Sequence, residues 1–185
     1  MKQKTQKTNW IFLLIGVFTC LLIRLIPFRV PNIEPILATQ IPFTKAYGTF
    51  IGFFFGVSSI ILYDIVTNTL GVWTPITATT YGLVGLFIAH FFQKRSMSRK
   101  NIVSSAVIST LFYDALTGLS IGPLFFNQSF AVAFVGQIPF TALHLVGNII
   151  FSLLVSPVLY RFLMRPQRLR QNIPEISLLP KPIII

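Results

Sequence analysis

Two of the acidic residues, Asp64 and Asp114, lie near the ends of long apolar segments, where a carboxylate could bind a ligand. The chain has 185 residues and only four Asp and Glu residues in total. Each of these aspartates is the second residue of a Tyr-Asp-x-x-Thr pattern. Acidic groups inside a membrane are costly and usually functional, and an anion at a helix C-terminus opposes the helix dipole. The pattern favours a binding role, while a helix-end role with Arg24 or Arg29 as ion-pair partner stays open.

A second set of polar residues follows one face of the last apolar segment. Gln137, Thr141, His144 and Asn148 lie at i, i+4, i+7 and i+11, which is one side of a helix. Lipid would penalise such a face, so it is expected to point into a helix bundle or a wet cavity. Hydrogen bonding between helices is the alternative to ligand binding. Tyr81, in an earlier apolar segment, offers a flat ring for stacking.

These residues together predict one substrate-binding cavity near the outer face of a membrane. Its members are Asp64, Asp114, Tyr81, His144 and Asn148. Carboxylates accept hydrogen bonds from amine, amide or hydroxyl groups, and such charge-assisted bonds contribute about 1.5–3 kcal/mol each. The expected ligand is small, at least partly cyclic, and neutral or cationic.

Enzyme chemistry and bound cofactors are not expected from this sequence. It contains no phosphate-binding loop of the GxxxxGK[ST] type, no HExxH and no GxSxG pattern. Cys20 is the single cysteine, so neither a disulfide nor a cysteine-based metal cluster can form within the chain. No catalytic residue and no metal ligand is predicted.

The elements that must position the site are transmembrane helices. Hydrophobic residues make up 54% of the chain, charged residues 10%, and Phe occurs 19 times. About 20 consecutive apolar residues cross a bilayer as a helix. The apolar runs are Trp10–Ile26, Ala46–Val66, Thr74–Phe92, Ile102–Leu119 and Phe130–Leu163. The chain is therefore predicted to be an all-α integral membrane protein.

The positive charges predict how the helices cross the membrane. The net charge of +11 could indicate nucleic acid binding. However, Lys and Arg gather near the N-terminus, at 94–100 and at 161–170. This distribution favours contact with lipid headgroups, so nucleic acid is not an expected partner. Short basic segments stay in the cytoplasm. If all three are cytoplasmic, an even number of crossings precedes residue 94, so a further span is required at 32–45. The result is six transmembrane helices with both termini cytoplasmic.

The predicted organisation has three parts. Residues 1–9 form a cytoplasmic basic N-terminus, 10–165 a six-helix membrane domain, and 166–185 an extended cytoplasmic tail. The first helix is expected to remain uncleaved, a signal peptide being the alternative. Pro139 is expected to kink the long last span or to separate an outer segment from it.

Small residues predict close helix packing in the third span. Gly48, Gly52 and Gly56 repeat at four-residue spacing, which lets helix backbones approach. Gly16 and Cys20 form a weaker small pair in the first span.

Residues 24 to 87 resemble the substrate-specific S component of energy-coupling-factor (ECF) transporters. The resemblance is most specific in "NIEPILA", "YDIVT", "GVWT" and "TYGLVG". It implies a six-helix protein of a bacterial or archaeal plasma membrane that binds a vitamin or other micronutrient near the outer face. It also implies partners, namely a transmembrane scaffold subunit and two cytoplasmic ATPases. Many S components meet the scaffold through an Ala-x-x-x-Ala pair in the first helix, where this sequence has Gly16 and Cys20.

Two other functions remain open from the sequence. One is a membrane scaffold of envelope or cell-shape assembly, similar to the MreD family, which would have no reason for a polar outer cavity. The other is a self-sufficient channel, for which the cytoplasmic halves of the spans look too apolar.

Overall fold

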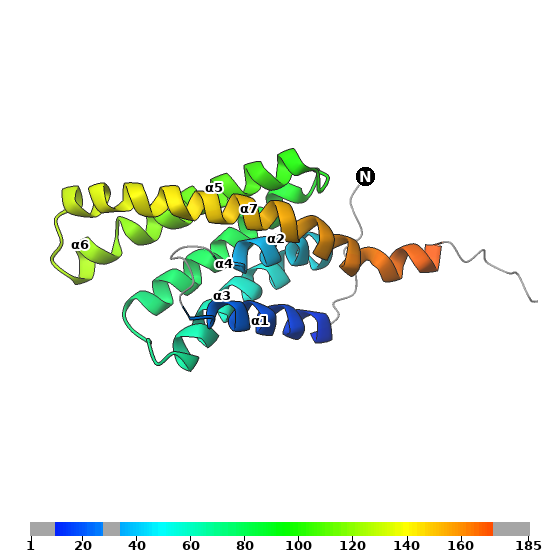
Figure 1. Cartoon of the computed structure of the whole chain (residues 1–185), viewed down its shortest axis with the longest axis horizontal. Helices are drawn as coiled ribbons and strands as arrows, with labels where there is room; N and C mark the ends of the chain where they lie inside the picture. Colours follow the sequence, from blue (N-terminus) through cyan, green and yellow to red (C-terminus); the bar gives the residue numbers. More distant parts are fainter. Residues whose placement is uncertain (1–9, 28–33, 172–185) are drawn as a thin grey trace, which may run out of the picture.

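The computed structural model describes residues 10–27 and 34–171, and this part of the chain is helical (Figure 1). The helices in chain order are α1 (Trp10–Arg24), α2 (Ile36–Tyr47), α3 (Thr49–Val66), α4 (Trp73–Phe92), α5 (Arg99–Gly118), α6 (Ile121–Phe125) and α7 (Phe130–Gln171). The all-α prediction is confirmed for the described residues. Residues 1–9, 28–33 and 172–185 lie outside them.

Four helical segments are long and apolar enough to cross a membrane: Thr49–Val66, Trp73–Phe92, Arg99–Phe125 and Phe130–Met164. Large apolar side chains are exposed along them, including Phe50, Leu154 and Val158. Such surface is unfavourable in water and suits contact with lipid tails. These features indicate a multi-pass membrane protein.

The third and fourth helices pack more closely than ordinary side chains allow. A Cβ atom added to Gly85 of α4 would lie 2.2 Å from the carbonyl oxygen of Gly52 in α3. One added to Gly56 would lie 2.4 Å from the carbonyl oxygen of Tyr81. The prediction that Gly52 and Gly56 permit close backbone approach is confirmed. The third glycine of the series, Gly48, has a φ of 92° and lies between α2 and α3.

The short helix α2 folds back along α3 and occupies the centre of the bundle (Figure 1). Thr44 meets Gly52, and Gln40 meets Gly56, so the two helices run antiparallel from the turn at Gly48. Every residue of α2 except Lys45 is buried. The Gln40 Nε2 amide donates hydrogen bonds of 2.9 Å to the carbonyl oxygens of both Gly52 and Tyr81. One side chain thereby ties α2 to α3 and α4.

The dimensions of α2 differ from those expected of a membrane span at 32–45. Its 12 residues measure about 18 Å at 1.5 Å per residue, against a hydrocarbon core of about 30 Å. Pro35 precedes the helix and Gly48 ends it, which limits its length. The helix α2 alone is thus shorter than the hydrocarbon core is thick, and its residues are covered by the other helices of the bundle.

The first helix is also short for a span, and its small residues face inward. It has 15 residues. A Cβ atom on Gly16 would lie 2.7 Å from the ring of Phe43 in α2, and the buried Cys20 thiol lies 3.9 Å from the carbonyl oxygen of Pro35. Both small residues therefore serve packing inside the chain. The outward face of α1 carries exposed large side chains such as Leu14 and Phe18.

The last helix is longer than predicted and has no separated outer segment. It runs without interruption from Phe130 to Gln171 through Pro139, and its C-terminal part projects beyond the other helices (Figure 1). Of the two effects expected of Pro139, the separation of an outer segment is therefore wrong. Residues 166–171, expected in the extended tail, belong to the helix, and the rest of that tail lies outside the described residues.

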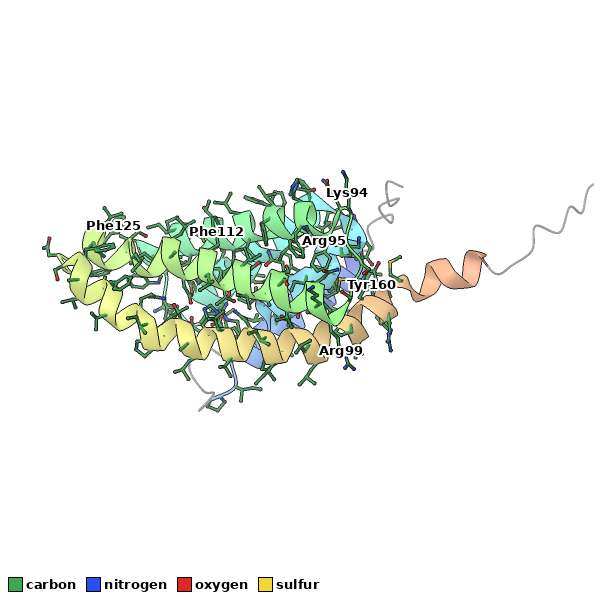
Figure 2. All side chains as sticks on the ribbon, turned by 90° about the horizontal axis from the view of Figure 1, so that it is seen from above. Lys94, Arg95, Arg99, Phe112, Phe125 and Tyr160 are labelled. Atoms are coloured by element: carbon green, nitrogen blue, oxygen red, sulfur yellow. The ribbon has the colours of Figure 1, made fainter. Side chains whose placement is uncertain are left out.

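The basic residues between α4 and α5 gather at one end of the bundle. Lys94, Arg95 and Arg99 lie at that end, and Phe125 of α6 lies at the other (Figure 2). Ser98 caps the start of α5, its hydroxyl accepting a 3.3 Å hydrogen bond from the Asn101 amide. The molecule thus has a basic end and, opposite to it, an end at which α3 and α5 finish.

Candidate functional site

The centre of the candidate site is a carboxylate–imidazole pair between α5 and α7. Asp114 Oδ1 and His144 Nδ1 are 2.7 Å apart, and both side chains are almost completely buried. Since an ionised carboxylate only accepts hydrogen bonds, Nδ1 is the donor. One helical turn closer to the start of α5, Asn148 Nδ2 donates a 2.8 Å hydrogen bond to Thr110 Oγ1. The two bonds fix α5 and α7 in an antiparallel register.

Several atoms of this cluster are buried without a hydrogen-bond partner. They include Asp114 Oδ2, His144 Nε2 and Asn148 Oδ1. Asp114 and Asn148 are each 1% exposed, and His144 is 3% exposed. Leaving a buried polar group unpaired costs about 1–3 kcal/mol. Unpaired groups gathered at one place are a reason to look for a function there.

The unpaired groups continue along the contact between α5 and α7. Ser105 and Ser109 on α5 and Ser152 on α7 are buried hydroxyls without a partner. The next residue of this series, Ser156, donates a 2.6 Å hydrogen bond to the carbonyl oxygen of Ala38 in α2. The contact between α5 and α7 therefore remains polar from the Asp114–His144 pair toward the start of α5.

Aromatic rings from α4, α5 and α7 lie next to the pair. The ring centroids of Tyr81 and Tyr113 are 4.2 Å apart, and Tyr113 meets the His144 ring edge-on at 5.9 Å. Phe140 approaches the same imidazole at 5.8 Å. Tyr81 is therefore linked to the Asp114–His144 pair by its contact with Tyr113.

Asp64 has a different environment from Asp114. Its Oδ2 accepts a 2.6 Å hydrogen bond from the Thr74 hydroxyl. The same hydroxyl oxygen accepts a hydrogen bond of 3.1 Å from the Gly71 amide, and the Thr69 amide donates to the Asp64 carbonyl oxygen. These bonds connect the end of α3 to the start of α4. Asp64 therefore organises the loop between the two helices.

The arginine proposed as an ion-pair partner of the aspartates pairs with another residue. Arg24 is buried, and its Nη2 lies 3.4 Å from Glu34 Oε1. Its Nη1 donates a 3.0 Å hydrogen bond to the Ser59 carbonyl oxygen, and its guanidinium lies 3.8 Å from the centroid of the Tyr63 ring. Arg24 thus joins α1 to α3, and the alternative in which Arg24 pairs with one of the two aspartates is not what the structure shows. Arg29 lies outside the described residues.

Four of the five predicted site residues therefore meet or approach one another, namely Tyr81, Asp114, His144 and Asn148. The sequence reasoning missed Thr110, which binds Asn148, and gave Tyr113 no role in the site. A clue was available, because Thr110 and Tyr113 share the helical face of Asp114. Two residues of the predicted polar face, Gln137 and Thr141, bond to each other at 3.1 Å.

A separate cavity of about 400 Å³ lies between α1, α2 and α7. Its lining is almost entirely apolar and includes Phe12, Phe43, Phe151 and Phe162. None of the five predicted site residues lines it. A polar ligand would find few matching groups on these walls, chiefly Thr19 and Thr39, so this cavity is not the predicted substrate site.

Comparisons with known protein families, with characterised proteins and with solved structures found no match. Among the described residues, no group of three or more His, Cys, Asp or Glu could hold a metal ion. Any function of this chain therefore has to be inferred from the Asp114 cluster itself.

Proposed function

We propose that this protein is the membrane substrate-binding subunit of an ECF-type importer, which captures a vitamin or other micronutrient at the outer face. The observation that carries the proposal is the buried cluster of Asp114, His144 and Asn148, with its unpaired oxygen and nitrogen atoms. A scaffold protein without a ligand gains nothing from such a cluster, because unpaired buried polar groups lower stability. The resemblance of residues 24–87 to S components supports the same function.

The proposal includes the arrangement of the chain in a bacterial or archaeal plasma membrane. Both termini and the basic segment 94–100 are cytoplasmic, and the ends of α3 and α5 face outward. With α1 and α2 counted, the helices make six passes, α2 doing so as a short helix covered by its neighbours. The gathering of Lys94, Arg95 and Arg99 at one end of the bundle supports this orientation.

Single cysteines test the topology in a Cys20→Ser background. In intact cells, a membrane-impermeant maleimide should label cysteine at Asn68 or Gln128 and should leave cysteine at Ser96 unlabelled. Permeabilised cells provide the control, since all three positions should then react. Labelling of Ser96 from outside would overturn the orientation.

Transport by this subunit requires partners, because the sequence contains no phosphate-binding loop. The expected partners are a transmembrane scaffold subunit and two ATPases. Gly16 packs against Phe43 of α2, and Cys20 lies next to Pro35, which precedes α2. The scaffold must therefore contact other residues than this small pair. Affinity purification from native membranes should recover both kinds of partner, whereas an MreD-like scaffold would be recovered with envelope-assembly proteins. Concentrative uptake by the purified chain alone in liposomes would rule out the proposal.

A further inference from the structure

We propose that the Asp114 cluster binds its ligand as an organic cation whose charged N–H edge is attached to a flat ring. This inference rests on the proposed function and names the chemical class of its substrate. It is carried by the balance of charge in the site, by the hydrogen-bonding character of the unpaired atoms and by the adjacent rings.

The charge balance favours a cation. Within the described part of the chain, Arg24 lies 3.4 Å from the partly buried Glu34, and Asp114 Oδ1 lies 2.7 Å from His144 Nδ1. Arg24 and Glu34 offset each other, and Asp64 is bound by a neutral threonine hydroxyl. Asp114, whose second carboxylate oxygen is buried without a partner, is therefore the acidic group that a cationic ligand would meet. A buried charge needs a partner of opposite sign.

The unpaired atoms favour a ligand that donates hydrogen bonds. Asp114 Oδ2 and Asn148 Oδ1 are unpaired acceptors. The Asn148 amide orientation is consistent with this, since its Nδ2 already donates to Thr110. An amidinium, a guanidinium or a protonated amine supplies several N–H donors together with positive charge. A carboxylate or phosphate ligand supplies neither.

The surrounding rings favour a flat group next to the cation. Tyr81 and Tyr113 present a pair of aromatic rings at 4.2 Å, and Tyr113 also contacts His144. Aromatic rings attract both other rings and cations. A ring bearing the cationic group would therefore contact Tyr113 or Tyr81 while its N–H edge meets Asp114.

Three probes of one shape test the inference. Benzamidine, benzamide and benzoate carry the same phenyl ring with a positive, neutral or negative substituent at neutral pH. Binding to the full chain in lipid nanodiscs is measured by ligand-observed NMR and by thermal shift. Benzamidine should bind at least tenfold more tightly than benzamide, and benzoate should be the weakest.

Isosteric variants test which residue causes the preference for benzamidine over benzamide. Asp114→Asn should reduce the benzamidine-to-benzamide ratio to about one, whereas Asp64→Asn should leave it unchanged, because Asp64 is engaged by Thr74. Asn148→Asp keeps Asp114 in place and should raise the ratio at least threefold. It serves as a second test if Asp114→Asn does not fold.

The possible outcomes separate this inference from the proposed function. Equal binding of the three probes, tighter binding of benzoate, or no binding of any probe at millimolar concentration would overturn the cation assignment. None of these results affects co-purification with a scaffold and ATPases, which tests the function. Conversely, a benzamidine preference in a chain that recovers no such partners would keep the site and reject the importer.

Discussion

The segments Tyr63–Thr67 and Tyr113–Thr117 have the same sequence pattern and the same local structure, but different surroundings. Each lies at the end of a long apolar helix. In each, the threonine hydroxyl donates to the carbonyl oxygen of the tyrosine four residues earlier, at 2.7 Å in the first and 2.8 Å in the second. Both aspartates are buried, 7% exposed at Asp64 and 1% at Asp114.

The difference lies in what each segment faces. At the end of α3, Asp64 bonds to Thr74 and Tyr63 is covered by Arg24. At the end of α5, Asp114 bonds to His144, one of its oxygens is unpaired, and Tyr113 meets Tyr81. A repeated pattern thus produces a loop-fixing residue in one place and a candidate binding group in the other. The comparison shows that the local motif places a carboxylate, and that the facing helix decides its role.

The largest expected effect is on the α5 side of this comparison. His144→Leu removes the partner of a buried carboxylate, which should lower the free energy of unfolding by about 3–5 kcal/mol. Denaturant unfolding in detergent, followed by far-UV circular dichroism, measures the change. His90→Leu is the matched control, because His90 is exposed near the end of α4 and should have little effect. A loss at His144 no larger than at His90 would mean that Asp114 does not depend on the imidazole.

An intermediate effect is expected on the α3 side. Thr74→Val keeps the shape of the side chain and removes the donor to Asp64. The lost hydrogen bond to a charged group should cost about 1.5–3 kcal/mol of stability. Thr77→Val is the control, since the Thr77 hydroxyl donates only to the helix carbonyls of Trp73 and Thr74. If both variants unfold at the same denaturant concentration, Thr74 does not hold Asp64.

The smallest effect should be shared by the two segments. Thr67→Val and Thr117→Val each remove a hydroxyl that bonds to the tyrosine carbonyl four residues earlier, and Thr67→Val also removes an exposed 2.8 Å contact with the Thr69 hydroxyl. Because that carbonyl belongs to the helix ladder, each loss should be about 0.5 kcal/mol. Parallel unfolding curves of the two variants check the similarity. A difference above about 1 kcal/mol, close to a full hydrogen bond, would show that the local structures are not equivalent.

The predicted fold and the observed fold agree where the sequence signal is local. The predicted apolar runs match both ends of α3, α4 and α5 to within about three residues and match the start of α7, because length and composition alone meet the demands of a lipid core. The pattern of small residues predicted close packing, and α3 meets α4 there. The differences between the predicted and the observed helices concern α2 and α7. Charge counting required a span at 32–45, but it carries no information about length, and Pro139 is accommodated within a continuous helix.

The sequence by itself determined that the chain forms apolar helices, and that Asp64, Asp114, His144 and Asn148 are polar groups inside them. These properties depend on composition and on helical spacing, which are fixed within a single segment. The tertiary structure decided the partners, because a hydrogen bond between α5 and α7 depends on their register and on the neighbours of each helix. For this reason Asp114 and His144 form a pair, Arg24 binds Glu34 rather than an aspartate, and Asp64 is used by the loop that follows it.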